Sequence, residues 1–146
     1  MKIKVQENND IEEDEIIINC KKIDQDIQII IDFIKTIDNK LIGVKDDKTF
    51  LIKLKDIFYF ESVDKKSFVY TKDDVFEITL RLYQIEELNN NNFFRASKST
   101  IINISKIKEL NPVISGKIKV TLDNNEHLLV SRQYVPILKK ILGTGR

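Results

Sequence analysis

The spacing of apolar residues differs between two parts of the chain: it is helical over residues 25–37 and extended from residue 41. Between residues 25 and 37, isoleucines recur at the three- and four-residue intervals of one helix face. Asp24 directly precedes this run, and its carboxylate can accept a hydrogen bond from a free N–H group of the first turn. The pattern therefore predicts a helix over residues 25–37. Two short runs before it, residues 1–5 and 15–20, predict strands.

From residue 41 onwards the pattern is extended. Short apolar runs alternate with polar turns rich in Asp, Asn and Lys, which is typical of antiparallel strands joined by hairpins. The expected strands are residues 41–45, 49–53, 57–63, 68–71, 75–78, 107–110, 117–122 and 126–130.

Two short helices are expected among these strands. Thr79 is a suitable cap for a helix that ends near Leu88, and Ser131 for a final helix that stops at Gly143. We therefore predict an α+β fold that is predominantly β. A small strand–helix unit over residues 1–44, expected to dimerise or to bind a partner, precedes the main domain of residues 45–146.

The composition is that of a folded protein. Of the 146 residues, 42% are hydrophobic and 32% are charged, and there is a single cysteine, which excludes an internal disulfide. The first residues lack the apolar stretch of an export signal, and every apolar run is too short to span a membrane. We expect a cytoplasmic protein.

Charge is distributed unevenly along the chain. Residues 93–146 hold ten lysines and arginines against three acidic residues, a balance of +7, whereas residues 1–92 carry −6. Such asymmetry is typical of a protein with one face for an anionic partner. The alternative is a chance clustering of solvated lysines.

Residues for catalysis are few. The chain has one histidine, His127, and one cysteine, Cys20, and it has no glycine-rich phosphate-binding motif. Paired aspartates lie in predicted turns, where Asp is expected for backbone reasons. We predict no enzyme, no metal site, no cofactor and no small-molecule substrate.

The segment of residues 92–103 combines cations and a hydroxyl with flanking apolar residues. It places Arg95, Lys98 and Ser99 close together in what we expect to be a loop. Such cations can contact phosphates, Ser99 can donate to a phosphate oxygen, and Lys98 can reach a guanine edge. The alternative is a solvated loop between core elements.

Four segments, in order, resemble motifs of the LytTR family of bacterial DNA-binding domains. They are residues 57–62 (IFYFES), 82–88 (LYQIEEL), 94–103 (FRASKSTIIN) and 130–134 (VSRQY). Each motif alone would be weak, but four in order over roughly residues 45–143 identify a strong resemblance. It implies an elongated set of small antiparallel sheets with few helices, whose loops enter successive major grooves of bent double-stranded DNA.

The resemblance implies that three positions reach base edges. The first is Lys66 or Ser67, the second is Lys98 and the third is Arg132. Arg132 is the strongest candidate, because a guanidinium can bind guanine O6 and N7 with two hydrogen bonds. The alternative for Arg132 is an ion pair with a nearby acidic residue.

The family positions that hold the phosphate backbone correspond to Tyr83, Arg95 and Ser99. The chain departs from the family pattern at Ser97, where a histidine is frequent, and this leaves the base preference there open. We expect Asn103 to cap or bridge the backbone and not to touch DNA.

Most members of the family follow a phosphoacceptor receiver domain. About 45 residues precede the domain here, too few for such a domain, so the chain resembles the stand-alone subgroup. In that subgroup a small membrane protein often restrains the regulator, which makes such an inhibitor a candidate partner. Repeated half-sites favour a homodimer. The alternative function is a protein-interaction module in which the helix of residues 25–37 binds the partner.

Overall fold

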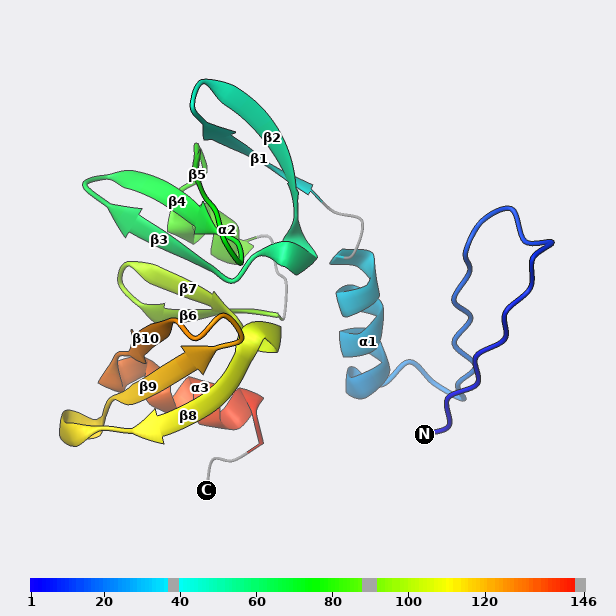
Figure 1. The fold of residues 1–146 in the computed structure, drawn as a ribbon. Helices are drawn as coiled ribbons and strands as arrows, with labels where there is room; N and C mark the ends of the chain where they lie inside the picture. Colours follow the sequence, from blue (N-terminus) through cyan, green and yellow to red (C-terminus); the bar gives the residue numbers. More distant parts are fainter. Residues whose placement is uncertain (37–39, 88–91, 144–146) are drawn as a thin grey trace.

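The computed structural model describes residues 1–36, 40–87 and 92–143, and within these ranges it forms two antiparallel sheets and three α-helices (Figure 1). The larger sheet has seven strands in the order β2-β1-β5-β4-β3-β7-β6, and the smaller has three in the order β10-β9-β8. The α+β fold with predominant antiparallel β-structure is confirmed. No described helix is both long and apolar enough to cross a membrane.

The bounds of the strands agree closely with the alternating runs of the sequence. The larger sheet contains β1 (Lys40–Lys45), β2 (Lys48–Lys53), β3 (Tyr59–Val63), β4 (Lys66–Tyr70), β5 (Val75–Ile78), β6 (Phe93–Ser97) and β7 (Thr100–Asn103). The smaller contains β8 (Ile107–Pro112), β9 (Ile118–Leu122) and β10 (His127–Val130).

Two-residue turns with positive φ at both positions make the first hairpins. Asp46 and Asp47 have φ of 51° and 61° between β1 and β2, and Asp64 and Lys65 have φ of 50° and 66° between β3 and β4. This backbone matches the right-handed twist of the flanking strands, and Asp adopts it more readily than most residues. Both hairpins were predicted from the sequence.

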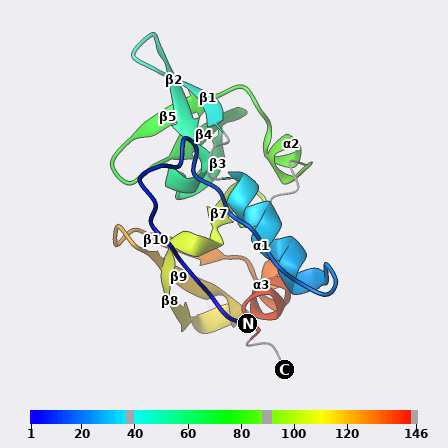
Figure 2. The same cartoon turned by 90° about the vertical axis from the view of Figure 1, so that its right-hand side faces the viewer.

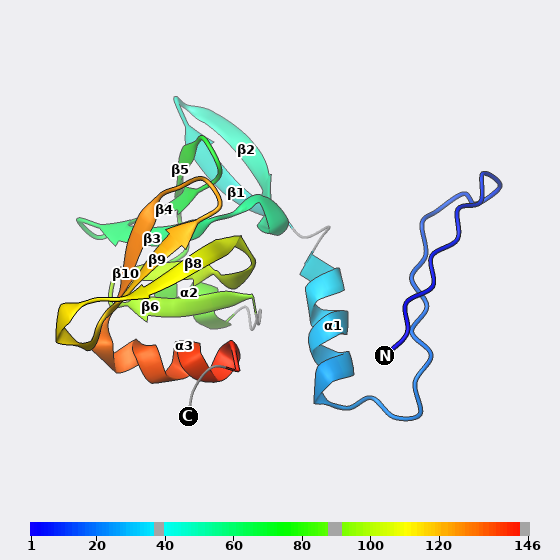
Figure 3. The same ribbon diagram turned by 60° about the horizontal axis from the view of Figure 1, so that its bottom comes forward.

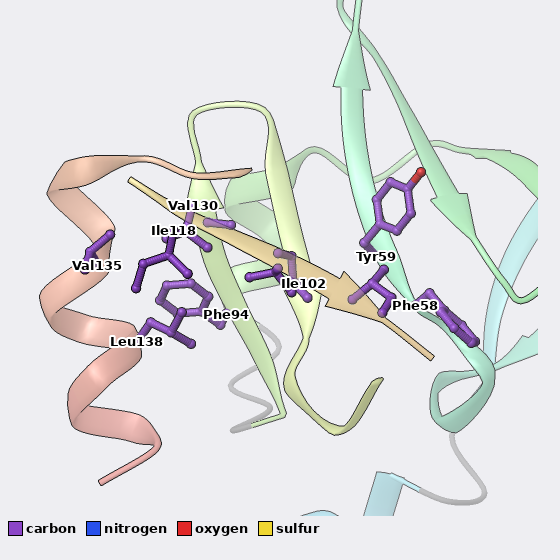
Figure 4. Packing of buried hydrophobic residues seen from close by; sticks show 11 residues of the cluster. Phe58, Tyr59, Phe94, Ile102, Ile118, Val130, Val135 and Leu138 are labelled. Atoms are coloured by element: carbon purple, nitrogen blue, oxygen red, sulfur yellow. The ribbon is translucent and has the colours of Figure 1, made fainter. Parts of the chain in front are cut away.

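The larger sheet has a hydrophobic core on each face, because neighbouring residues on one strand point to opposite sides. On β3, Phe60 belongs to the core that includes Leu82 and Ile85 of α2 (Leu82–Glu87). Tyr59, the preceding residue, belongs to the second core. That core lies between the end of the larger sheet, the three-stranded sheet and α3 (Val135–Ile141), where Leu138 packs toward Phe94 (Figure 4).

Asn103 lies at a buried position where the chain leaves the larger sheet. Its side chain, in a residue 2% exposed, donates to the Ile57 carbonyl at 2.7 Å. Its Oδ1 accepts from the backbone N–H of Ser105 at 3.0 Å and from its hydroxyl at 2.7 Å. These bonds cap the short 3₁₀ turn η2 (Ile104–Lys106) that leads from β7 to β8. The prediction that Asn103 caps and bridges backbone is confirmed.

The N-terminal segment differs from the prediction in part. The helix is confirmed as α1 (Gln25–Thr36), and Asp24 Oδ1 accepts from the Ile27 N–H at 2.9 Å. The predicted strands 1–5 and 15–20 are wrong, because residues 1–24 contain no strand. A strand needs a neighbour for its backbone groups, and this segment runs outside both sheets, beside α1 (Figure 2). Residue 37 lies outside the described residues.

Three further predictions change in detail. The segment of residues 92–103 is the hairpin β6–β7 and not a loop. Helix α2 begins at Leu82 without a Thr79 cap, and Gln84 Oε1 accepts from the Arg81 N–H instead. Ser131 offers no side-chain cap: a 3₁₀ turn, η4 (Arg132–Tyr134), precedes α3. Gly143, with φ of 70°, ends α3 as predicted. Leu88 lies outside the described residues.

Replacing Asn103 by alanine is expected to lower the free energy of unfolding by about 1–3 kcal/mol, because the Ile57 carbonyl would stay buried without its donor. Urea unfolding measures the change. Asn111→Ala is the matched control, since the Asn111 amide donates to Glu109 at the surface, and its effect should stay within about 0.5 kcal/mol. Equal effects of the two substitutions would show that the buried amide does not stabilise this connection.

Candidate nucleic-acid interface

Several loops of the main domain lie along one edge of the molecule. The turn between β3 and β4, the turn between β6 and β7, and the start of η4 all lie at the left edge in Figure 1, opposite α1. These loops carry four residues predicted from the sequence to contact DNA: Lys66, Lys98, Ser99 and Arg132. All four are exposed, and the two lysines and the arginine are cationic. The structure therefore brings together residues that are up to 66 positions apart in the chain.

Backbone hydrogen bonds hold these loops at fixed spacing. The Ser62 N–H donates to the Ser99 carbonyl at 2.8 Å and joins the β3–β4 hairpin to the β6–β7 turn. The Ser131 N–H donates to the Ala96 carbonyl at 2.8 Å and joins η4 to the other side of the same hairpin. The β6–β7 hairpin is thus bonded to both neighbours, and the three loops form one rigid row.

Arg95 points inward and braces the β6–β7 turn. Its Nε donates to the Ser97 carbonyl at 2.6 Å and its Nη2 donates to the Lys98 carbonyl at 2.5 Å. Nη1 forms an ion pair with Glu86 of α2. The side chain is 21% exposed. In this geometry the guanidinium positions Lys98 and Ser99.

Ser97 contributes to the same turn. Its Oγ accepts a hydrogen bond from the Ser99 N–H at 3.2 Å and lies 3.5 Å from the Ser99 Oγ. The residue that stands in place of the frequent family histidine therefore closes the turn locally, as serine side chains commonly do.

Lys66 and Ser67 differ in accessibility. Ser67 is buried, with 3% of its surface exposed, whereas Lys66 is exposed at the start of β4. Of the two alternatives, Lys66 is the residue that a ligand at this edge can reach. Arg81, which was not predicted as a site residue, precedes α2, and its guanidinium donates to the Lys65 carbonyl in this turn. Arg81 and Lys65 are 16 positions apart, so no local sequence pattern indicates this contact.

Tyr83 lies in the first turn of α2 and is 60% exposed. Arg81, two residues before it, bonds the start of α2 to the β3–β4 turn. Tyr83 is thus open to solvent on α2, outside the row of loops.

Arg132 begins η4 and is exposed. The two ion pairs among the described residues, Lys45–Asp74 and Arg95–Glu86, do not include it. The alternative that Arg132 is neutralised by a nearby acidic residue is therefore not observed in the described part of the chain. Its guanidinium carries five N–H donors, and no acidic residue in the described part of the chain forms an ion pair with it.

Two tyrosines stack in the core that the larger sheet shares with the three-stranded sheet. Tyr59 of β3 stacks on Tyr70 of β4, with ring centroids 4.2 Å apart. Burial raises the pKa of Tyr59, and the Glu126 carboxylate raises it further. The phenol therefore stays protonated at physiological pH.

The His, Cys and acidic side chains of the described residues are dispersed. No three of their His, Cys, Asp and Glu side chains gather closely enough to hold a metal ion. His127 Nδ1 lies 3.0 Å from Thr121 Oγ1, and Cys20 is exposed in the N-terminal segment. The chemistry gathered at the loop edge is that of hydrogen-bond donors and positive charge, which suits an anionic ligand.

Comparisons with known proteins agree with this chemistry. Residues 47–143 match the LytTr DNA-binding domain family. Uncharacterised HTH-type transcriptional regulators of Staphylococcus aureus are similar: the one of strain NCTC 8325 is 29% identical over 144 residues, 97% of this chain and 98% of the relative. That of strain MSSA476 is 29% identical over 127 residues, 86% of each chain.

A solved LytTr DNA-binding domain from Bacillus cereus has the same fold. Its TM-score is 0.69 at 25% identity, and the match covers 73% of this chain and 98% of the solved one. The Staphylococcus relatives therefore share nearly the whole length of this chain, whereas the solved domain lacks a counterpart for part of it.

Arg95→Ala is expected to lower the free energy of unfolding by about 1–3 kcal/mol, because the Ser97 and Lys98 carbonyls and the Glu86 carboxylate lose charged donors. Urea unfolding tests this. Lys98→Ala, an exposed change in the same turn, is the control and should stay within about 0.5 kcal/mol. If Arg95→Ala instead leaves stability unchanged and weakens only DNA binding, Arg95 is a phosphate contact, as the family resemblance implies.

Proposed function

The chain belongs to the LytTr DNA-binding domain family and is a DNA-binding regulator, and we propose that it reads duplex DNA in the cytoplasm through the row of loops at one edge. The observation that carries this proposal is the alignment of the exposed Lys66, Lys98 and Arg132 on three loops joined by backbone hydrogen bonds. Loops whose backbone is already ordered lose less conformational entropy on binding.

Each loop has a separate task in this proposal. Arg132 binds a guanine through O6 and N7 in the major groove, because a guanidinium without an ion-pair partner can make both bonds at once. Lys98 reaches a base edge in the neighbouring groove and Ser99 donates to a phosphate oxygen. Lys66, on the third loop, reaches a base edge, and Tyr83 contacts the phosphate backbone.

Loops, and not a recognition helix, are proposed to enter the grooves. The relatives are named HTH-type regulators, but in the described ranges no two α-helices of this chain are joined by a short turn. Strands separate α1, α2 and α3 from one another. The helices support the loops: Arg81, beside α2, bonds to the β3–β4 turn, and α3 follows η4, the turn that Arg132 begins.

Fluorescence anisotropy with the duplex upstream of the protein's own gene, in the presence of a shuffled competitor, tests the proposal. Affinity should fall steeply as salt rises, because each neutralised phosphate releases counterions. Arg132→Ala should weaken specific binding by about 1–3 kcal/mol and binding to random DNA little.

Lys55→Ala is the matched control for this experiment. Lys55 is exposed in the 3₁₀ turn η1 (Leu54–Asp56), at the end of the sheet opposite to the loop row (Figure 1). Its substitution should leave the preference for specific over random DNA unchanged. An equal loss on specific and random DNA after Arg132→Ala would make Arg132 a phosphate anchor and remove it as a base contact.

The isoleucine stripe of α1 is proposed to be the contact between two chains of a homodimer. The stripe consists of Ile27, Ile30, Ile31 and Ile34, and none of them belongs to either hydrophobic core. α1 stands apart from the sheets (Figure 3). The similarity to the Staphylococcus regulators extends over 97% of the chain and so includes this segment. An apolar helix face outside the core favours association with another helix.

Ile27→Asp combined with Ile34→Asp is expected to convert the dimer to a monomer, because two buried charges in a helix contact are costly. Sedimentation equilibrium measures the mass. Ile29→Asp is the control: Ile29 lies off the stripe and is 44% exposed, so this variant should stay dimeric. An unmodified chain that is monomeric at all concentrations would contradict the proposal and favour a partner protein as the ligand of α1.

A further inference from the structure

An apolar side chain stands in solvent at the loop edge. Ile114, in the turn η3 (Ile114–Gly116) between β8 and β9, is 93% exposed, and its neighbour Val113 is 37% exposed. Ile114 belongs to neither hydrophobic core. Folding thus leaves an isoleucine in water where a polar residue would serve a simple turn better.

The backbone of this loop is held in an unusual conformation. Ser115 has φ of 78° and ψ of 18°, in the left-handed region, and Gly116 follows with φ of 75°. The Val113 N–H donates to the Lys117 carbonyl at 3.0 Å and closes the loop. A serine in this region is strained, and such strain concentrates at functional sites.

The loop lies directly against Arg132. A Cβ atom at Gly116 would be 3.1 Å from Arg132 Cδ and 3.2 Å from Arg132 Cγ. The absence of a side chain at Gly116 therefore lets the loop touch the stem of the arginine. The loop is on the same edge as the hairpin turns and beside the start of α3 (Figures 1 and 3).

We propose that residues 113–117 form a fourth DNA-contacting loop, in which Ile114 packs against the methyl group of thymine next to the base pair contacted by Arg132. This inference rests on the proposed function of Arg132. Ile114 thereby becomes a specificity-determining residue that favours thymine, while Arg132 favours guanine.

If Arg132 contacts guanine in the major groove, Ile114, on the loop that lies against Arg132, faces the apolar group of that groove. Guanine O6 and N7 lie in the major groove, and so does the thymine methyl group, which is its main apolar feature. The Cα atoms of Ile114 and Gly116 are at most ~7.6 Å apart, because consecutive Cα atoms are ~3.8 Å apart. Stacked bases rise about 3.4 Å per step. Ile114 therefore reaches bases within about two steps of the one that Arg132 contacts.

Deoxyuridine substitution measures this contact directly, since deoxyuridine pairs like thymidine but lacks the methyl group. The probe is a duplex selected from a randomised library with the full chain, and the selection should show a thymine preference beside the Arg132-dependent guanine. Deoxyuridine at that position should weaken binding roughly three- to fivefold, the size expected for one buried methyl group. Ile114→Ala should weaken binding to the thymine duplex by a similar factor and should bind both duplexes equally.

Two variants control for fold and for loss of apolar surface. Ile114→Leu keeps an apolar side chain and should retain sensitivity to the methyl group. Leu51→Ala removes an isoleucine-sized side chain that is 65% exposed on β2 and should leave both affinity and methyl sensitivity unchanged. The unfolding midpoint of Ile114→Ala should equal that of the unmodified chain.

Two outcomes separate this inference from the proposed function. If Arg132→Ala weakens specific binding but deoxyuridine has no effect, or has the same effect on Ile114→Ala, the fourth loop is overturned and the DNA-reading edge stands. If no duplex is selected, or Arg132→Ala binds the selected duplex as tightly as the unmodified chain, both proposals are overturned.

Discussion

The loop edge depends on the backbone hydrogen bonds that join the β6–β7 hairpin to both of its neighbours. The Ser62 N–H bonds the turn of the hairpin on one side, and the Ser131 N–H bonds its first strand on the other. Separate loops would each have to be ordered when a ligand binds, at the cost of conformational entropy. Bonded through one hairpin, they present their side chains at a spacing that folding has already set.

The two hydrophobic cores make this arrangement rigid. Neighbouring residues on β3 and on β7 belong to opposite cores: Phe60 and Ile101 pack on one face, Tyr59 and Ile102 on the other. The strands that carry the loops are therefore buried on both faces, which resists bending, because packed interiors have few voids to absorb it. Asn103 then fixes the passage from the larger sheet to the smaller one.

Polar and apolar groups share the loop edge. Arg95 uses its guanidinium within the protein, on the turn that presents Lys98, while Arg132 keeps its donors free of carboxylates in the described part of the chain. The strained loop that carries Ile114 lies against Arg132 at Gly116. An edge with cations, hydroxyls and an isoleucine matches the major groove of DNA, which offers phosphates at its rim and both acceptors and methyl groups on its floor.

Sequence alone determined the features that depend on local chemistry. The aspartates of the first hairpin, the Asp24 cap of α1, the glycine that ends α3 and the ordered motifs of residues 57–134 all follow from spacing and from the conformations that single residues allow. Tertiary structure decided which side chains are available. It turned Arg95 inward, buried Ser67 and paired residues 93–97 with 100–103 as a hairpin. It left residues 1–24 without a strand partner and placed Gly116 against Arg132. These outcomes rest on contacts between residues distant in the chain or on the lack of a neighbouring strand, and neither leaves a periodic pattern in the sequence.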